Sequence, residues 1–229
     1  MTRTTTLLAA AGAVLAATAA LPAHAQVEGR LATVDVTRTI IGTTAFQTAY
    51  EQVNTTYAEQ TNLRRTKVQE RQNLLVKFDK NKDNNIEGDE KTAMEKSPDY
   101  AKIQTLEQEI VGLTNQVDGA RVYAVEQIIV QYSSALADVT TAEKIKLVID
   151  PSTLLFAPPE ADITAKVTTA LNTRVPAVGV VPPAGWQPSR EGIQLYQDIQ
   201  QRLQLAAQIQ QQQAAAAAQQ GDPAAPVGR

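Results

Sequence analysis

Two long amphipathic segments, separated by a polar break, dominate the chain between residues 44 and 140. In the second segment, apolar residues recur at steps of three and four, which is the narrow apolar stripe of a coiled-coil helix. The first segment repeats this spacing in a more polar form. The stripe residues are Phe46, Tyr50, Val53, Tyr57, Leu75 and Phe78, and then Ile103, Leu106, Ile110, Leu113, Val117, Ala120, Ala124, Ile128, Tyr132 and Ala135. Two such helices joined by a short break fold back as an antiparallel pair.

The length of these segments predicts a projecting hairpin. A helix of roughly 35 residues extends about 50 Å, which is too long for a compact core. We therefore expect the hairpin to project from a body that holds its base. In the first segment, Gln60, Arg64 and Arg71 fall near the apolar stripe. They indicate either a flexible hairpin that keeps surface free for a partner or ordinary variation within a coiled coil.

Short segments on both sides of the hairpin predict the body. Residues 31–36 and 145–150 are apolar and β-branched, as strands are, and residues 154–156 are a candidate third strand. A short helix is predicted over residues 161–171. The predicted fold is α+β and mainly helical, with a small β body and a long antiparallel helical hairpin. Because a sheet of three short strands is marginal alone, we expect several chains to share one core.

These elements divide the chain into regions. The first strand of the body lies in residues 26–43, the hairpin in 44–141, and the remaining strands with the short helix in 142–174. A Pro-rich linker follows over residues 175–188, and then a Gln/Ala-rich helical or disordered tail over 189–229. The tail is either a solvated, partly helical extension or a docking helix for a partner or another subunit.

Residues 1–25 predict a secretory signal peptide. Arg3 supplies a positive start, residues 7–21 form an apolar run, and Ala23-His24-Ala25 is a cleavage site. The apolar run is too short to span a membrane comfortably, although a retained anchor is the alternative. Gln26 would be the first mature residue. No later stretch predicts a transmembrane helix, so we expect no stable membrane insertion.

Composition excludes several kinds of site. His24 is the single histidine, and the chain has no cysteine. The mature chain would therefore lack Ser-His-Asp and Cys-His nucleophilic sites, thiol redox chemistry and the common zinc sites. The formal net charge is −3, and nothing indicates a nucleic-acid partner. Paired carboxylates remain candidate catalysts, but elongated helices offer no convergent pocket, so we predict no enzyme.

The order of elements resembles the Skp/OmpH family of periplasmic chaperones. A strand, a long helical hairpin, a strand pair and a closing short helix follow a signal peptide. Residues 31–36 are similar to the first strand of the family, and residues 45–47 to its early helical start. Residues 146–150 and 162–164 are similar to the closing strand and to the Asp-Ile-Thr start of the last helix. The resemblance covers residues 30 to 175.

This resemblance implies a periplasmic homotrimer. A β body would join the subunits, and three hairpins would enclose a cavity for unfolded outer-membrane proteins. The implied activity is that of an ATP-independent holdase, and the chain has no Gly-rich phosphate loop. The chain departs from the family in being mildly acidic and in the tail after Arg174. The alternative is a structural coiled-coil envelope protein with a calcium-stabilised tip and no client.

The polar break, residues 79–90, is similar to an EF-hand calcium loop. Its oxygen-bearing side chains fall at loop positions 1, 3, 5, 9 and 12, and calcium prefers such oxygen ligands. Asn84 stands at the sixth position, where glycine is usual, and asparagine tolerates the left-handed backbone required there. The candidate Ca²⁺ ligands are Asp79, Asn81, Asp83, the Asn85 carbonyl, Glu87 and Glu90. We expect a weak site, with a Kd of about 10⁻⁴–10⁻³ M as in extracellular modules. The alternative is a solvated Asx-rich turn.

Overall fold

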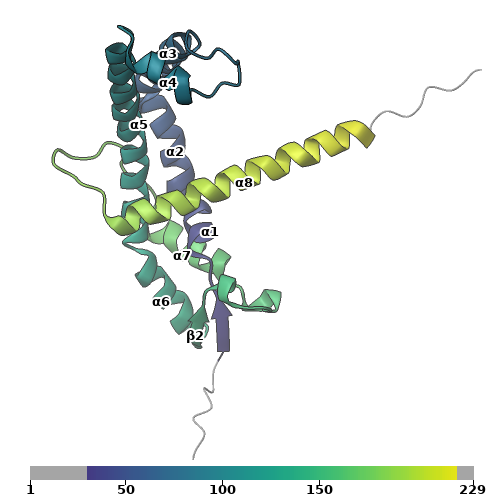
Figure 1. Ribbon diagram of the computed structural model, residues 1–229. Coiled ribbons are helices and arrows are strands. Elements are labelled where there is room, and N and C mark those ends of the chain that lie inside the picture. Colours follow the sequence, from purple (N-terminus) through teal and green to yellow (C-terminus); the bar gives the residue numbers. More distant parts are fainter. Residues whose placement is uncertain (1–29, 221–229) are drawn as a thin grey trace, which may run out of the picture.

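A computed structural model describes residues 30–220, with side chains as far as residue 217. The predicted signal peptide, residues 1–25, and the last part of the predicted tail lie outside the described residues. A long helical hairpin stands on a small body, and the last helix crosses the base of the hairpin (Figure 1). The elements in chain order are β1 (Arg30–Thr33), α1 (Val36–Ile41), α2 (Thr44–Thr56), α3 (Ala58–Leu75), α4 (Gly88–Glu95), α5 (Tyr100–Ile129), α6 (Tyr132–Ala142), β2 (Ile145–Ile149), the 3₁₀ turns η1 (Pro151–Thr153) and η2 (Pro159–Ala161), α7 (Thr164–Arg174) and α8 (Arg190–Gln220).

The two strands that flank the hairpin meet, which confirms the predicted mainly helical α+β fold. β1 pairs with β2 in parallel, with Ala32 opposite Val148. Parallel neighbours require a long crossover, and here the whole hairpin supplies it. The predicted third strand is wrong. Residues 154–156 lie between the two 3₁₀ turns, and the sheet of the described residues has two strands.

The first strand is shorter than predicted, because the chain enters a helix early. The Asp35 carboxylate accepts a hydrogen bond from the Arg38 backbone N–H at 2.8 Å and caps α1. The Asp35 backbone N–H in turn donates to Thr164 Oγ1 at 3.1 Å. Backbone N–H groups that donate to these side chains are not available for pairing with a neighbouring strand. β1 therefore ends at Thr33, and α1 replaces the expected connection.

Each predicted long helix is divided into two. Tyr57 leaves helical geometry, with φ −108° and ψ 25°, and separates α2 from α3. Val130 and Gln131 separate α5 from α6. The apolar stripe nevertheless continues across both breaks and is buried at most of its predicted positions. The buried stripe residues are Phe46, Val53, Ile103, Leu106, Val117, Ala120, Ala124, Ile128 and Ala135.

Most of the apolar core lies at the base of the hairpin. One face of α7 and of the turn before it is fully buried, as the spacing of Ile163, Val167 and Leu171 predicts. Ile128 from α5 and Ile199 from α8 complete this cluster. Each such side chain contributes about 1.5–3 kcal/mol of transfer free energy. The body is thus held together by elements from both ends of the described chain.

The two halves of α8 differ in burial. In the first half of α8, Leu195, Tyr196 and Ile199 are buried against the body and α5. Residues 204–217 are exposed, and this half of α8 projects away from the hairpin (Figure 1). The first half of α8 therefore packs on its own chain, which neither predicted interpretation of the tail included.

Candidate functional site

The loop at the tip of the hairpin is organised around Asp79. Its carboxylate accepts hydrogen bonds from the backbone N–H groups of Asp83 at 3.2 Å and Asn84 at 3.0 Å. Asn84 adopts the left-handed conformation, with φ 63°, at the sixth loop position. The backbone therefore turns where an EF-hand loop turns, with asparagine in place of glycine.

Glu90 closes the same loop from the other side. Its Oε1 accepts hydrogen bonds from the backbone N–H groups of Lys80 at 2.8 Å and Asn81 at 3.3 Å. α4 begins at Gly88, so Glu90 lies in the first helical turn, where a negative charge is favourable. The carboxylate that would close a calcium site thus holds the loop together through backbone groups.

The remaining candidate ligands form two side-chain pairs. Asn81 donates to Asp83 at 2.7 Å, and Asn85 donates to Glu87 at 2.6 Å. Within residues 30–220, no cluster of three or more histidine, aspartate or glutamate side chains is close enough to hold a metal ion. The six predicted ligands share one loop, but side-chain oxygens of Asp79, Asn81, Asp83, Glu87 and Glu90 accept hydrogen bonds within that loop.

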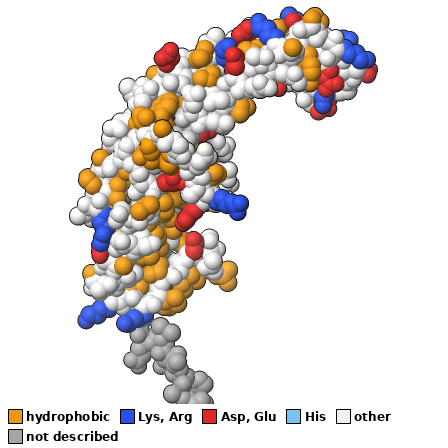
Figure 2. Space-filling model, turned by 90° about the vertical axis from the view of Figure 1, so that its left-hand side faces the viewer, with side chains coloured by type: hydrophobic (Ala, Val, Ile, Leu, Met, Phe, Trp, Pro, Cys, Tyr) orange, Lys and Arg blue, Asp and Glu red, His pale blue; other side chains and the backbone are white. Residues whose placement is uncertain are grey.

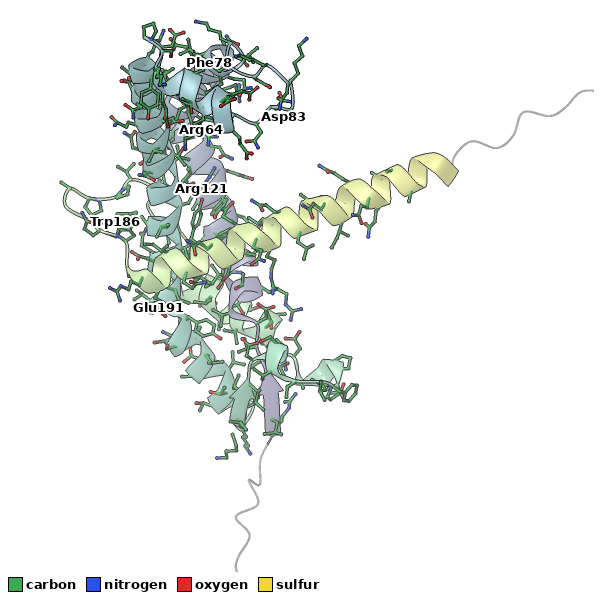
Figure 3. All side chains as sticks on the ribbon, viewed as in Figure 1. Arg64, Phe78, Asp83, Arg121, Trp186 and Glu191 are labelled. Atoms are coloured by element: carbon green, nitrogen blue, oxygen red, sulfur yellow. The ribbon has the colours of Figure 1, made fainter. Side chains whose placement is uncertain are left out.

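The middle of the hairpin is polar, and some of its buried polar atoms lack hydrogen-bond partners. Gln60 Oε1 and Arg71 Nε are buried and have no hydrogen-bond partner in this structure. Arg64 is exposed (Figure 3), but it lines a hollow of about 250 Å³ together with Val117, so it lies beside the stripe as predicted. The ion pairs Lys67–Glu109 and Glu70–Lys102 join the helices at 2.7 and 2.6 Å. Solvent-exposed ion pairs of this kind contribute little to stability, so this region is held loosely.

The root of the hairpin has its own apolar cluster. α2 contributes Ala49 and Val53, and α5 contributes Val117, Ala120 and Ala124. These small side chains allow the two helices to approach closely. The cluster is closed from outside by Val180, which is 8% exposed. Val180 belongs to residues 176–189, which we call the strap. The predicted Pro-rich linker, residues 175–188, is therefore packed against the hairpin at Val180.

The strap is bound to α5 through its backbone. Gln127 Nε2 donates to the Gly179 carbonyl at 2.8 Å, and the Gly179 N–H donates to Gln127 Oε1 at 3.0 Å. The Tyr57 hydroxyl donates to the Val180 carbonyl at 3.4 Å. α5 and the break between α2 and α3 thus hold one non-helical segment.

A second set of contacts holds the other end of the strap. The Glu126 carboxylate accepts hydrogen bonds from Trp186 Nε1 at 3.2 Å and from both the N–H and the hydroxyl of Ser189 at 2.6 Å. Trp186 lies on the strap beside α5 (Figure 3), and its ring meets the Tyr123 ring edge-on, with centroids 5.3 Å apart. The sequence pattern did not predict these contacts. The one available signal was the single tryptophan of the chain, which lies inside a Pro-rich stretch.

Polar contacts also join α8 to the hairpin. The Tyr196 hydroxyl donates to Asp118 at 2.7 Å, and Gln200 Nε2 donates to the Tyr50 hydroxyl at 3.1 Å. The Arg121 guanidinium lies 5.6 Å from the centre of the Tyr50 ring. Burial raises the pKa of Tyr50 to about 12, and burial together with the bond to Asp118 raises the pKa of Tyr196. Both phenols are therefore neutral donors or acceptors at ordinary pH.

A groove of about 790 Å³ runs between α8 and the base of the body. Its walls include Asp35, Asp150, Glu191 and Asp198, with Arg202 as their cationic neighbour. Arg202 pairs with Asp35 at 2.6 Å. The groove is acidic and open to solvent.

Several large apolar side chains of the body face solvent. Leu31 and Leu147 on the strands are about half exposed, and Leu155 and Phe156, in the predicted third strand, are almost fully exposed. Hydrophobic side chains gather over the body in Figure 2, whereas charged side chains gather toward the hairpin tip. Exposed apolar patches of this kind mark contacts with other molecules.

Comparisons with known proteins identify one family. A family model described as "Outer membrane protein (OmpH-like)" matches residues 30–171. No curated protein matches the chain significantly. Among solved structures, the chain is similar to an OmpH-like candidate outer membrane chaperone from Caulobacter crescentus CB15, with 15% identity and a TM-score of 0.38 over 69% of this chain and 94% of that chain. No helix in residues 30–220 is both long and apolar enough to cross a membrane. The strap and α8 lie beyond the family match.

Proposed function

This chain belongs to the OmpH-like family, and we propose on that basis that it is an ATP-independent periplasmic holdase for unfolded outer-membrane proteins. The observation that carries the proposal is the hairpin of α2–α5, which projects from a small apolar body (Figure 1). A projecting hairpin buries little of its own surface and leaves long faces free for a client. Such a protein delays aggregation by covering apolar segments of the client, without a nucleotide-driven step.

The loosely held middle of the hairpin supports this proposal. The helix break at Tyr57 and the unbonded groups of Gln60 and Arg71 reduce the rigidity of a long helix pair. A hairpin that bends at these points adapts its surface to clients of different size. Many weak contacts then hold the client, and release requires no energy source.

We further propose that the protein assembles as a homotrimer through the body. A two-stranded sheet with unpaired edges is not stable alone, and Leu31, Leu147, Leu155 and Phe156 expose apolar surface beside it. Burial of these side chains between subunits would complete the sheet and place the hairpins around one cavity.

The direct test is a light-scattering assay with an unfolded porin diluted from denaturant. We expect a molar excess of the trimer to suppress aggregation in the absence of ATP. An unrelated coiled-coil protein at the same mass concentration is the control. Undiminished aggregation at molar excess would overturn the holdase function.

The alternative function is a structural envelope coiled coil with a calcium-stabilised tip and no client. The tip loop favours it, because Asp79 and Glu90 already hold the turn that a calcium ion would need. The mass of the mature protein in solution separates the two functions. A trimer supports the chaperone, and a monomer or dimer supports the spacer.

The periplasmic location rests on the predicted signal peptide. Export of the chain in a bacterial host, followed by intact-mass analysis of the periplasmic fraction, tests it. We expect a mature protein that begins at Gln26. A full-length chain held in the membrane fraction would support a retained anchor instead.

A further inference from the structure

The contact between Gln127 and Gly179 has the form of peptide recognition. A single side-chain amide donates to the carbonyl and accepts from the N–H of the same residue, at 2.8 and 3.0 Å. These two backbone groups are present in every residue except proline. An amide paired in this way binds the backbone of a segment, and this contact does not depend on the side chains of that segment.

The site leaves room for a side chain at the residue that Gln127 holds. The φ angle of Gly179 is not positive, so residues other than glycine can adopt this backbone. A Cβ added at Gly179 would lie 3.8 Å from Gln127 Oε1 and 3.8 Å from the Tyr123 ring, which is ordinary van der Waals contact. The position therefore has no steric or conformational requirement for glycine.

The next residue supplies an apolar anchor. The Val180 side chain enters the cluster of Val53, Val117 and Ala124, and its carbonyl accepts a hydrogen bond from Tyr57. Val181 is 64% exposed and points away from the cluster. One buried apolar side chain between backbone contacts is a requirement that many apolar segments satisfy.

We propose that the hairpin root is a binding site for a non-helical apolar peptide segment, and that residues 178–181 of the strap occupy it in cis. The proposal rests on the holdase function and names its client site. The ligand is a stretch of unfolded polypeptide with a β-branched or other apolar residue next to a position whose side chain is free. Strand-forming segments of unfolded outer-membrane proteins have this chemistry, because apolar and polar residues alternate along them.

The strap then acts as a built-in competitor. α7 holds it at one end, and the Glu126 contacts and α8 hold it at the other. A segment tethered so closely has an effective concentration on the order of millimolar or higher. A client segment binds only when the strap has left the site. The apparent affinity for the client is therefore the intrinsic affinity multiplied by the fraction of molecules from whose site the strap is absent.

The test uses a fluorescein-labelled synthetic peptide with the sequence of residues 176–183 and measures fluorescence anisotropy with the full mature protein. Val180→Asp places a charge in the apolar cluster and should expel the strap. We expect this variant to bind the peptide about tenfold more tightly than the unmodified protein, or better. Val181→Asp is the matched control, because residue 181 already faces solvent, and it should bind the peptide as the unmodified protein does.

A second pair of variants keeps the test valid if Val180→Asp perturbs folding. Gly179→Pro removes the N–H that donates to Gln127 and also restricts the backbone of residues 178 and 179, and it should also increase peptide binding. Adding Gln127→Ala to either strap variant should abolish that increase. Equal peptide binding in all folded variants, or an increase that survives Gln127→Ala, would overturn the site.

The outcome is separable from that of the holdase assay. The peptide assay contains no outer-membrane protein, and porin aggregation is measured independently. A protein that suppresses aggregation but shows no strap-dependent peptide binding would overturn the site alone. A protein that binds the peptide as expected but leaves aggregation unchanged would overturn the holdase function and the identity of the client, and would support the peptide site.

Discussion

Gly192 packs directly against the side chain of Glu126. A Cβ on residue 192 would lie only 2.6 Å from Glu126 Cγ, which is closer than such atoms approach in folded proteins. Glu126 holds this position because it accepts three hydrogen bonds from Trp186 and Ser189. The start of α8 and the end of the strap are therefore fitted to one carboxylate on the hairpin.

Gly192→Ala should detach this end of the strap. The Glu126 side chain can move aside, but it then loses the hydrogen bonds to Trp186 and Ser189. We expect a loss of about 1–3 kcal/mol in the free energy of unfolding and an altered Trp186 emission spectrum. Urea denaturation followed by fluorescence measures both, because Trp186 is the single tryptophan.

Gly112→Ala is the control for that change. Gly112 lies within α5, and an added Cβ would meet nothing within 4 Å. Alanine in a helix interior is favoured over glycine by roughly 0.5–1 kcal/mol, so this variant should be more stable. If Gly192→Ala matched Gly112→Ala in stability and emission, the Glu126 contact would have no structural role.

The exposed body residues predict the effect of a double substitution. Leu155→Ser with Phe156→Ser should convert the proposed trimer to monomers, because these side chains are almost fully exposed in one chain. Light scattering coupled to size-exclusion chromatography measures the mass. Val130→Ser is the control, since Val130 is 72% exposed but lies at the break between α5 and α6. An unchanged trimer mass in the double variant would rule out this surface as the subunit contact.

Alkaline pH should destabilise the hairpin root through Tyr50. Burial raises its pKa in the folded protein to about 12, from 10.0 in the unfolded chain. Between these values the unfolded state releases the phenol proton and the folded state retains it, so stability falls as pH rises above 10. The slope is at most about 1.4 kcal/mol per pH unit for this group.

Urea denaturation at several pH values between 8 and 11.5 measures this slope, and Tyr50→Phe should reduce it. Tyr57→Phe is the control, because it removes a phenol from the break between α2 and α3, in the same part of the hairpin. A slope that Tyr50→Phe leaves unchanged would assign the alkaline sensitivity to other groups, among them Tyr132, whose pKa burial raises to about 12.

The calcium prediction is tested at Glu90. Titration calorimetry should show heat on calcium addition, with a Kd of about 10⁻⁴–10⁻³ M, and Glu90→Gln should remove it. Asp89→Asn is the matched control. It removes the same charge from the neighbouring position, which is exposed and is not a predicted ligand. An absence of heat, or equal heat in both variants, would leave the tip as an Asx turn.

The parts of the fold that could be predicted are those set by local pattern. Steps of three and four residues identified the faces that bury Ile103 and Val117, and β-branched runs identified the two strands that pair. The tip loop was delimited because aspartate and asparagine stabilise turns through their own side chains. That residues 154–156 form no strand could not be predicted, since Leu155 and Phe156 have strand-like side chains but no neighbouring strand in the described residues.

The sequence by itself determined a mainly helical hairpin on a small β body and the family to which the chain belongs, because periodicity and the order of elements are local properties of the chain. Only the tertiary structure decided that the strap packs against the root of the hairpin. The contacts of Val180 with Val117 and of Gly179 with Gln127 join residues more than fifty positions apart. No local pattern records such a pairing, because a Pro-rich segment has the same composition whether it is solvated or packed against a helix.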